Sequence, residues 1–263
     1  MIIVPKTLAS EVGDAINVLL KESDRYRNWD DVEVQTVLRE IKKLQKIDAR
    51  VAFVQFGALA AICGNVDDVV TYYKKALLLP GEPETKHEFW VSLANAGLYS
   101  KAHEVGNWLL DRKRGFYPKI WNLAVSLGQV LAVWDRLPEA KMTYPDLAEV
   151  DFSFVERAAA VMQGRRLTDQ AIASVFDLMG EIQRAHRIMF SGSLVSIPKV
   201  MRPPEDPSYL YLTMPLDASV DEIHAMNREL TGFVVRKLPE GAFPEGMVAA
   251  FAKSHPIELR AAA

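Results

Sequence analysis

Three glycines form the most restrictive pattern in this chain, because each one separates two helix-like segments at a nearly constant interval. Gly64, Gly97 and Gly128 follow one another at spacings of 33 and 31 residues. The segments on either side of each glycine carry apolar residues at intervals of three and four, which is typical of amphipathic helices. A two-helix repeat of this length predicts an array in which each helix pair buries its apolar face against the next pair.

The unit around Gly64 carries a small residue, a turn glycine, an aromatic residue, a second small residue and a closing proline in order. These residues are Gly57, Gly64, Tyr73, Ala76 and Pro80. This order resembles the tetratricopeptide repeat family, and the resemblance covers about residues 47–137. It is weaker in the later units: in the second only Gly97, Tyr99 and Ala102 fit, and Trp90 and Trp121 occupy the place of the small residue. An irregular helical bundle is the alternative.

The resemblance implies a scaffold that binds a peptide or a partner protein on the surface of its first helices. Some members of the family clamp a terminal carboxylate there with Lys and Asn, whereas this chain offers apolar side chains. We therefore predict that a partner contacts Val51, Val54, Ala58 and Trp90. Because large apolar patches are uncommon on monomers, we expect this face to be covered. The cover is either the chain's own N-terminal helix or C-terminal unit, or the amphipathic helix of a partner.

The second half of the sequence follows a different pattern and predicts a small α+β domain. A long helix is expected over 169–190 and another over 219–236, with strands near 193–201, 209–214 and 247–251. The predicted fold class is mostly α. An N-terminal domain over 1–145, a tetratricopeptide-like helical repeat or α-solenoid, precedes the α+β domain over 146–263.

The composition excludes several classes of protein. The chain has 263 residues, 49% of them hydrophobic, and a formal net charge of −3, so it is neither disordered nor strongly basic. The small net charge argues against a nucleic-acid or membrane-surface partner. The N-terminus lacks the pattern of a signal peptide, and no apolar run approaches the length of a membrane helix. We expect a cytoplasmic, bacterial-type protein.

Catalytic and ligand-binding motifs are scarce. The single cysteine, Cys63, lies among apolar residues and is expected to be buried. No glycine-rich phosphate loop, nucleophile turn or histidine pair at ligand spacing occurs, so no cofactor or metal ion is predicted. The sequence favours a non-catalytic protein that binds a partner protein, such as an adaptor, an immunity or antitoxin protein, or a chaperone-like protein.

Two rival functions stay open. The first is an enzyme with an active site between the two halves that uses His186, His224 or nearby carboxylates. The second is an anion or nucleic-acid binder. Its site would be a patch formed by the four arginines that flank the long helix: Arg165, Arg166, Arg184 and Arg187. Cations near a helix C-terminus also stabilise the helix dipole, which is the structural explanation for Arg184 and Arg187.

Overall fold

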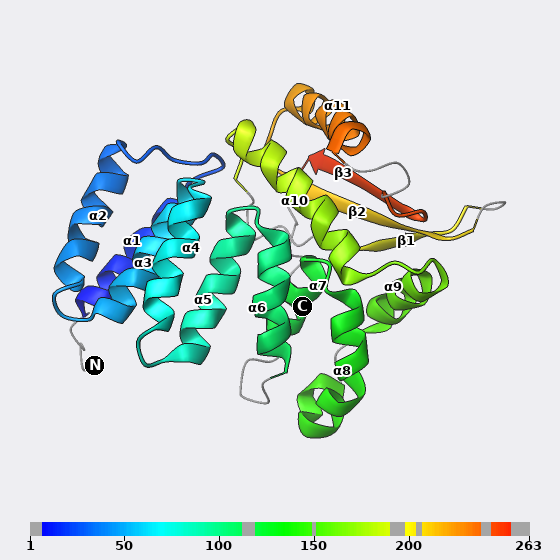
Figure 1. Ribbon diagram of the computed structural model, residues 1–263, viewed down its shortest axis with the longest axis horizontal. Helices are drawn as coiled ribbons and strands as arrows, with labels where there is room; N and C mark the ends of the chain where they lie inside the picture. Colours follow the sequence, from blue (N-terminus) through cyan, green and yellow to red (C-terminus); the bar gives the residue numbers. More distant parts are fainter. Residues whose placement is uncertain are drawn as a thin grey trace, which may run out of the picture.

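The computed structural model describes residues 7–111, 119–148, 151–189, 198–203, 207–237 and 243–253. These residues form mostly α-helices and one small three-stranded sheet (Figure 1). The elements are α1 (Leu8–Lys21), α2 (Val32–Leu44), α3 (Ala49–Ile62), α4 (Val66–Leu77), α5 (Glu82–Asn95), α6 (Tyr99–Leu110), α7 (Lys119–Ser126), α8 (Val130–Thr143), η1 (Pro145–Ala148), α9 (Ser153–Gly164), α10 (Asp169–Ala185), β1 (Lys199–Met201), β2 (Tyr209–Leu216), α11 (Val220–Lys237) and β3 (Met247–Lys253). No helix in this part of the chain is both long enough and apolar enough to cross a bilayer.

Helices α1 to α6 form an array that has α1 and α2 at one end and α6 at the other (Figure 1). Helix α3 contacts α1, α2, α4 and α5, so it packs at the centre of this group of helices. Local capping supports these helices. The Asp48 carboxylate accepts the Val51 N–H at the start of α3, and the Asn65 side chain accepts the Asp68 N–H at the start of α4.

The three glycines that define the sequence repeat all occupy tight turns. Gly64, Gly97 and Gly128 have φ angles of 69°, 68° and 88°. Glycine adopts this left-handed conformation at little cost because it has no Cβ. The turns end α3, α5 and α7 and lead into α4, α6 and α8, so the predicted turn positions are confirmed.

Close packing between α3 and α4 explains the small residue in the first unit. The ring of Tyr73 lies against Gly57, and a Cβ at Gly57 would overlap that ring. Tyr73 is fully buried, and its hydroxyl lies 2.8 Å from the Ser92 Oγ of α5. One aromatic side chain thus joins the first helix pair to the next.

The C-terminal sheet has the order β1-β2-β3, with β1 antiparallel and β3 parallel to β2. Helix α11 connects β2 to β3, as a parallel pair requires. It begins with a capping box in which Ser219 and Glu222 bond each other's backbone N–H. The expected strands over 209–214 and 247–251 and the helix over 219–236 are confirmed. Of the strand expected near 193–201, Lys199–Met201 forms β1, and residues 193–197 lie outside the described residues.

The long helix predicted over 169–190 is wrong at its C-terminal end, because α10 stops at Ala185. Arg187 adopts a left-handed φ of 57°, and the N–H of Ile188 bonds the carbonyl of Gln183. This is a Schellman end, which usually carries glycine. Because arginine stands there, no glycine marks the end of the helix in the sequence. The apolar periodicity also runs on through Met189, so the predicted helix is too long.

Helix α10 lies across the ends of several helices of the array (Figure 1). Neither α6 nor α8 has a side-chain cap of its own at its N-cap residue. Helix α10 supplies the missing acceptors. Asp177 accepts the N–H of Ser100 in α6 at 3.1 Å, and Asp169 accepts the N–H groups of Leu131 and Ala132 in α8 at 3.0 and 2.8 Å. Arg184 of α10 also donates to the carbonyls of Ala96 and Gly97 after α5, at 2.7 and 2.9 Å.

One buried apolar cluster extends from α3 to β3. It includes Val54 of α3, Tyr99 of α6, Phe176 of α10 and Phe251 of β3, so it crosses the domain boundary predicted near residue 145. A second cluster lies among α1, α2 and α3. The predicted domains 1–145 and 146–263 therefore pack on each other through α10 and share a core.

Candidate functional site

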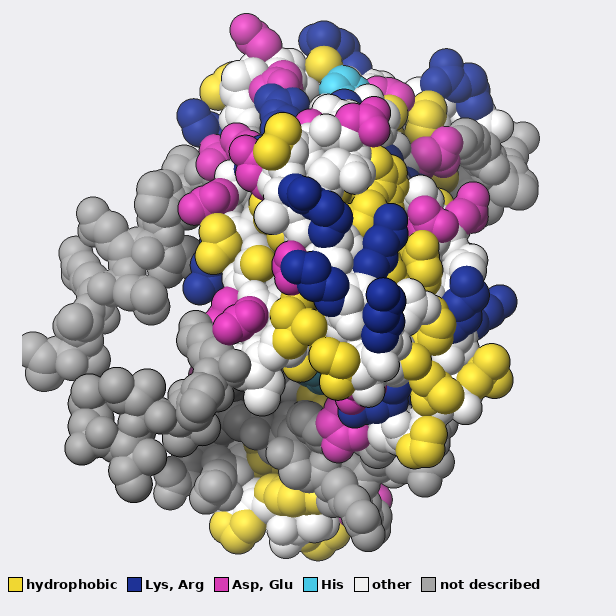
Figure 2. All heavy atoms as spheres, turned by 90° about the vertical axis from the view of Figure 1, so that its left-hand side faces the viewer, with side chains coloured by type: hydrophobic (Ala, Val, Ile, Leu, Met, Phe, Trp, Pro, Cys, Tyr) yellow, Lys and Arg dark blue, Asp and Glu magenta, His cyan; other side chains and the backbone are white. Residues whose placement is uncertain are grey.

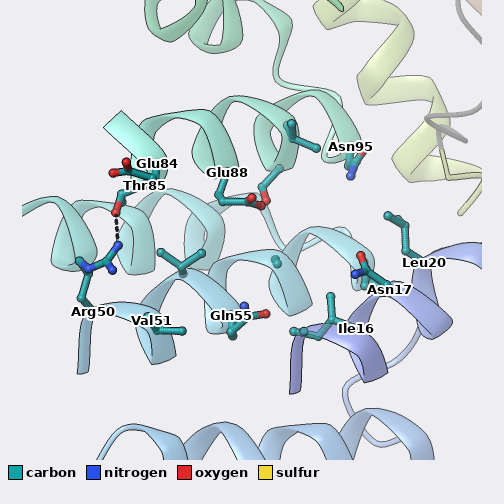
Figure 3. A pocket seen from close by; sticks show the side chains of 16 residues that line it. Ile16, Asn17, Leu20, Arg50, Val51, Gln55, Glu84, Thr85, Glu88 and Asn95 are labelled. Atoms are coloured by element: carbon teal, nitrogen blue, oxygen red, sulfur yellow. Dashed lines mark hydrogen bonds between the residues drawn. The ribbon is translucent and has the colours of Figure 1, made fainter. Parts of the chain in front are cut away.

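A groove with a volume of about 340 Å³ lies among α1, α3 and α5 (Figure 3). We call it the inner groove. Its floor is apolar and comes mainly from α3, and Ile16 and Leu20 of α1 form one side. The groove is lined by Gly13, Ile16, Asn17, Leu20, Arg50, Val51, Val54, Gln55, Ala58, Ile62, Glu84, Thr85, Glu88, Val91, Ser92 and Asn95.

Polar side chains surround this apolar floor. At one end the Arg50 guanidinium donates to the Thr85 Oγ1 at 3.3 Å. Glu84 and Glu88 come from the α5 wall. The side-chain amides of Asn17 and Asn95 lie at the opposite end in Figure 3. The groove therefore offers apolar contact along its length, carboxylates on one wall and amides that both donate and accept hydrogen bonds.

Three of the four residues predicted to contact a partner line this groove together. Val54 is buried, whereas Val51 and Ala58 are half-buried. Trp90 does not join them, because its side chain is fully buried and its indole lies near Gly106 and Gln129. Helix α5 turns Trp90 into the core, so this tryptophan is corrected from a surface contact to a core residue.

The chain covers only part of the predicted apolar face. Val54 and Trp90 are buried in the larger cluster. Val51 and Ala58 stay partly exposed beside α1. A partner therefore has apolar surface to contact.

The four arginines of the predicted anion patch do not come together. Arg165 and Arg166 end α9, whereas Arg184 and Arg187 lie at the far end of the 17-residue α10. Given the rise of an α-helix, this separation is roughly 25 Å. Three of them also bond backbone carbonyls: Arg165 donates to Ser208, Arg184 to Ala96 and Gly97, and Arg187 to Tyr26. The predicted patch is wrong, since these side chains join elements of the fold.

The two histidines of the predicted active site differ in position: His186 follows α10 at its contact with α11, whereas His224 is an exposed residue of α11. His186 pairs with Glu229, their Nε2 and Oε2 atoms 2.8 Å apart. Arg25 contacts Glu222 at 2.5 Å, and this hydrogen bond, together with those from Ser219, lowers the pKa of the Glu222 carboxyl to about 2. Neither His186 nor His224 lines the inner groove. Among the described residues, no three His, Cys, Asp or Glu side chains gather closely enough to hold a metal ion.

The Cys63 thiol and the His103 imidazole, which lie outside the inner groove, are both held in their neutral forms. Burial, together with the charge of Asp31, raises the pKa of the Cys63 thiol to about 12. Burial also lowers the pKa of His103, whose Nε2 donates to the Leu127 carbonyl at 2.6 Å. A thiol with a raised pKa is a poor nucleophile, so Cys63 has the chemistry of a structural residue.

A second hollow, of about 590 Å³, lies between α2, α3 and α4 and was missed by the sequence analysis. We call it the outer groove. The signal was present, since Leu38, Lys42 and Gln45 recur at helical spacing, as do Asp68, Tyr72 and Lys75. It is lined by Trp29, Leu38, Lys42, Gln45, Phe53, Phe56, Asn65, Asp68, Tyr72 and Lys75.

Comparison of the chain with protein families, with curated proteins and with solved structures gives no significant match.

Proposed function

We propose that this chain is a non-catalytic binding protein that holds a segment of a partner protein in the inner groove. In this proposal the helix pairs of the first half form a tetratricopeptide-like solenoid, and the protein works as an adaptor, an immunity or antitoxin protein, or a chaperone-like protein. The observation that carries it is the convergence of Val51, Val54 and Ala58 on one hollow among α1, α3 and α5.

The lining of the groove suits a polypeptide. Half-buried Val51 and Ala58 gain by burying the apolar side chains of a partner. The amides of Asn17, Gln55 and Asn95 can pair with peptide N–H and C=O groups, each of which needs a partner when water is removed. Glu84 and Glu88 on one wall favour a segment with a basic side chain.

Affinity capture with the full chain as bait, quantified by mass spectrometry, tests this proposal. The groove variant is Ala58→Arg, which places a long charged side chain on the floor. Ala185→Arg is the matched control, because Ala185 is an exposed helical alanine outside the groove. Thermal unfolding of both variants checks that they fold.

The proposal predicts that a captured partner, once purified, binds Ala58→Arg at least about tenfold more weakly, equivalent to about 1.4 kcal/mol. The same partner should bind Ala185→Arg and the wild type alike. A partner that binds folded Ala58→Arg as tightly as the wild type would overturn the inner groove as the binding site. Turnover of a small molecule that is lost on changing His186 or His224 would overturn the non-catalytic assignment.

A further inference from the structure

The outer groove lies on a different face of the array from the inner groove. Its two walls are stripes on α2 and α4, and its floor comes from α3. Leu38 and Lys42 lie on the α2 wall, and Tyr72 and Lys75 lie on the α4 wall. Each stripe spans eight residues, from Leu38 to Gln45 and from Asp68 to Lys75, so the groove is roughly 10 Å long, enough for about two turns of a docked helix.

Aromatic side chains line the floor and one wall of this groove. The rings of Phe56 and Tyr72 stack with centroids 4.9 Å apart, and Trp29 and Phe53 are packed beside them. Trp29, Phe53 and Tyr72 are only partly buried. Aromatic side chains that stay partly exposed in a hollow are typical anchors of protein interfaces.

The rim of the groove is positively charged. Lys42 and Lys75 stand on opposite walls, and no ion pair to a described carboxylate is found for either one. The acidic side chain of the lining, Asp68, is already held by the Asn65 amide at 2.7 Å. Figure 2 shows Lys and Arg side chains in a row over this end of the molecule, with hydrophobic side chains beside them. On and just after α2, the exposed cations are Arg39, Lys42, Lys43 and Lys46.

The ring faces favour a protein ligand over a nucleic acid. Nucleobases bind by stacking on free aromatic faces. Here the ring of Tyr72 stacks on Phe56, and the ammonium of Lys75 lies 5.4 Å from the Tyr72 centroid and 5.8 Å from that of Phe53. A base would have to displace this lysine, whereas a carboxylate would pair with it where it stands.

We propose that the outer groove binds an acidic, amphipathic segment of a partner protein. An apolar side chain of the segment enters between Leu38 of the α2 wall and Tyr72 of the α4 wall, over Phe53 of the floor. Its carboxylates then meet Lys42 and Lys75 on the two rims. Charge complementarity on the rim selects an acidic partner, and burial of the apolar side chain against the aromatic floor provides affinity.

Two experiments test the proposal. Random dodecapeptides displayed on phage are selected on the immobilised full chain, and the selected peptides are then titrated as fluorescein conjugates by fluorescence anisotropy. The groove variant is Lys42→Glu with Lys75→Glu. The matched control is Lys46→Glu with Lys74→Glu, which makes the same change of charge beside the groove, since neither residue lines it. Both double variants change exposed side chains, so both are expected to fold.

The proposal predicts selected peptides that combine Asp or Glu with a large apolar residue. They should bind the groove variant at least about tenfold more weakly and the control within about twofold of the wild type. Selection of basic peptides, of peptides indifferent to the groove variant, or of no binding peptides would overturn it. So would oligo(dT) binding that the groove variant abolishes, or self-association in sedimentation that depends on Lys42 and Lys75.

Discussion

The backbone of Gly97, in the turn between α5 and α6, lies directly against the backbone of Gly180 in α10. A Cβ added at Gly97 would stand 2.8 Å from the Cα of Gly180, and a Cβ added at Gly180 would overlap the Gly97 carbonyl. Two backbones approach this closely only where both residues lack a side chain. This contact, together with the hydrogen bonds of Arg184, fixes where α10 crosses the helical array.

Replacing Gly180 with alanine should therefore destabilise the protein, although alanine is the better helix former. The added methyl group forces α10 away from the turn, at a cost of about 1–3 kcal/mol. Gly164→Ala is the control, because nothing lies within 4 Å of a Cβ at Gly164. Urea unfolding of both variants measures the effect. Equal stability of Gly180→Ala and the wild type would show that the contact relaxes freely.

The carboxylate of Asp169 caps α8 from a distant part of the chain. It accepts the N–H groups of Leu131 and Ala132, and its pKa is raised because burial outweighs these hydrogen bonds. Asp169→Ala leaves both donors without this acceptor and should cost about 1–3 kcal/mol. Asp135→Ala, an exposed change on α8 itself, should stay within about 0.5 kcal/mol of the wild type. Hydrogen exchange should quicken at the start of α8 in the first variant and not in the second.

Arg166 ends α9 with a left-handed φ of 56° and is exposed. An L-residue pays about 1–2 kcal/mol for this conformation, whereas glycine does not. We expect Arg166→Gly to stabilise the protein by about 1 kcal/mol and Arg166→Ala to leave it nearly unchanged. The difference between the two variants in urea unfolding isolates the backbone effect from the loss of the charge. A loss of stability in Arg166→Gly would indicate that the side chain contributes more than its backbone costs.

The Arg25–Glu222 pair predicts a pH dependence with a definite sign. The folded protein holds the pKa of Glu222 at about 2, below its ordinary value of 4.5. The stabilisation is therefore present above pH 4.5 and is lost as the pH falls toward 2. Glu222→Gln removes the charge but keeps a side chain that suits the capping box with Ser219.

The measurement for this pair is the free energy of unfolding of the wild type and Glu222→Gln across that pH range. The wild type should be the more stable protein at neutral pH, and the difference should shrink on acidification. A difference that stays constant with pH would show that the charge of Glu222 does not contribute to the stability of the protein.

Much of the fold follows from local signals in the sequence. The glycine spacing predicted the three turns, which the structure confirms. The strand over 209–214 was predicted, but that its leucines rather than its tyrosines are buried comes from the structure. The end of α10 was missed because Arg187, rather than glycine, holds the left-handed position.

The residues of the candidate sites also divide into those that local sequence signals place and those that only the tertiary structure places. Val51, Val54 and Ala58 share one face of α3 by periodicity alone, which is why the sequence could place them together. The position of Trp90 depends on how α5 is turned against α6 and α8, and the outer groove needs three helices at once. Neither relationship is encoded within one helix.

The sequence by itself determined the helix pairs, their turns and the apolar face of α3, because these depend on backbone preferences and on side-chain spacing within a few residues. Only the tertiary structure decided that α10 crosses the array and caps α6 and α8, and that the four arginines separate. Those outcomes depend on which distant backbone groups lack hydrogen-bond partners and on where two glycines leave room for helices to meet.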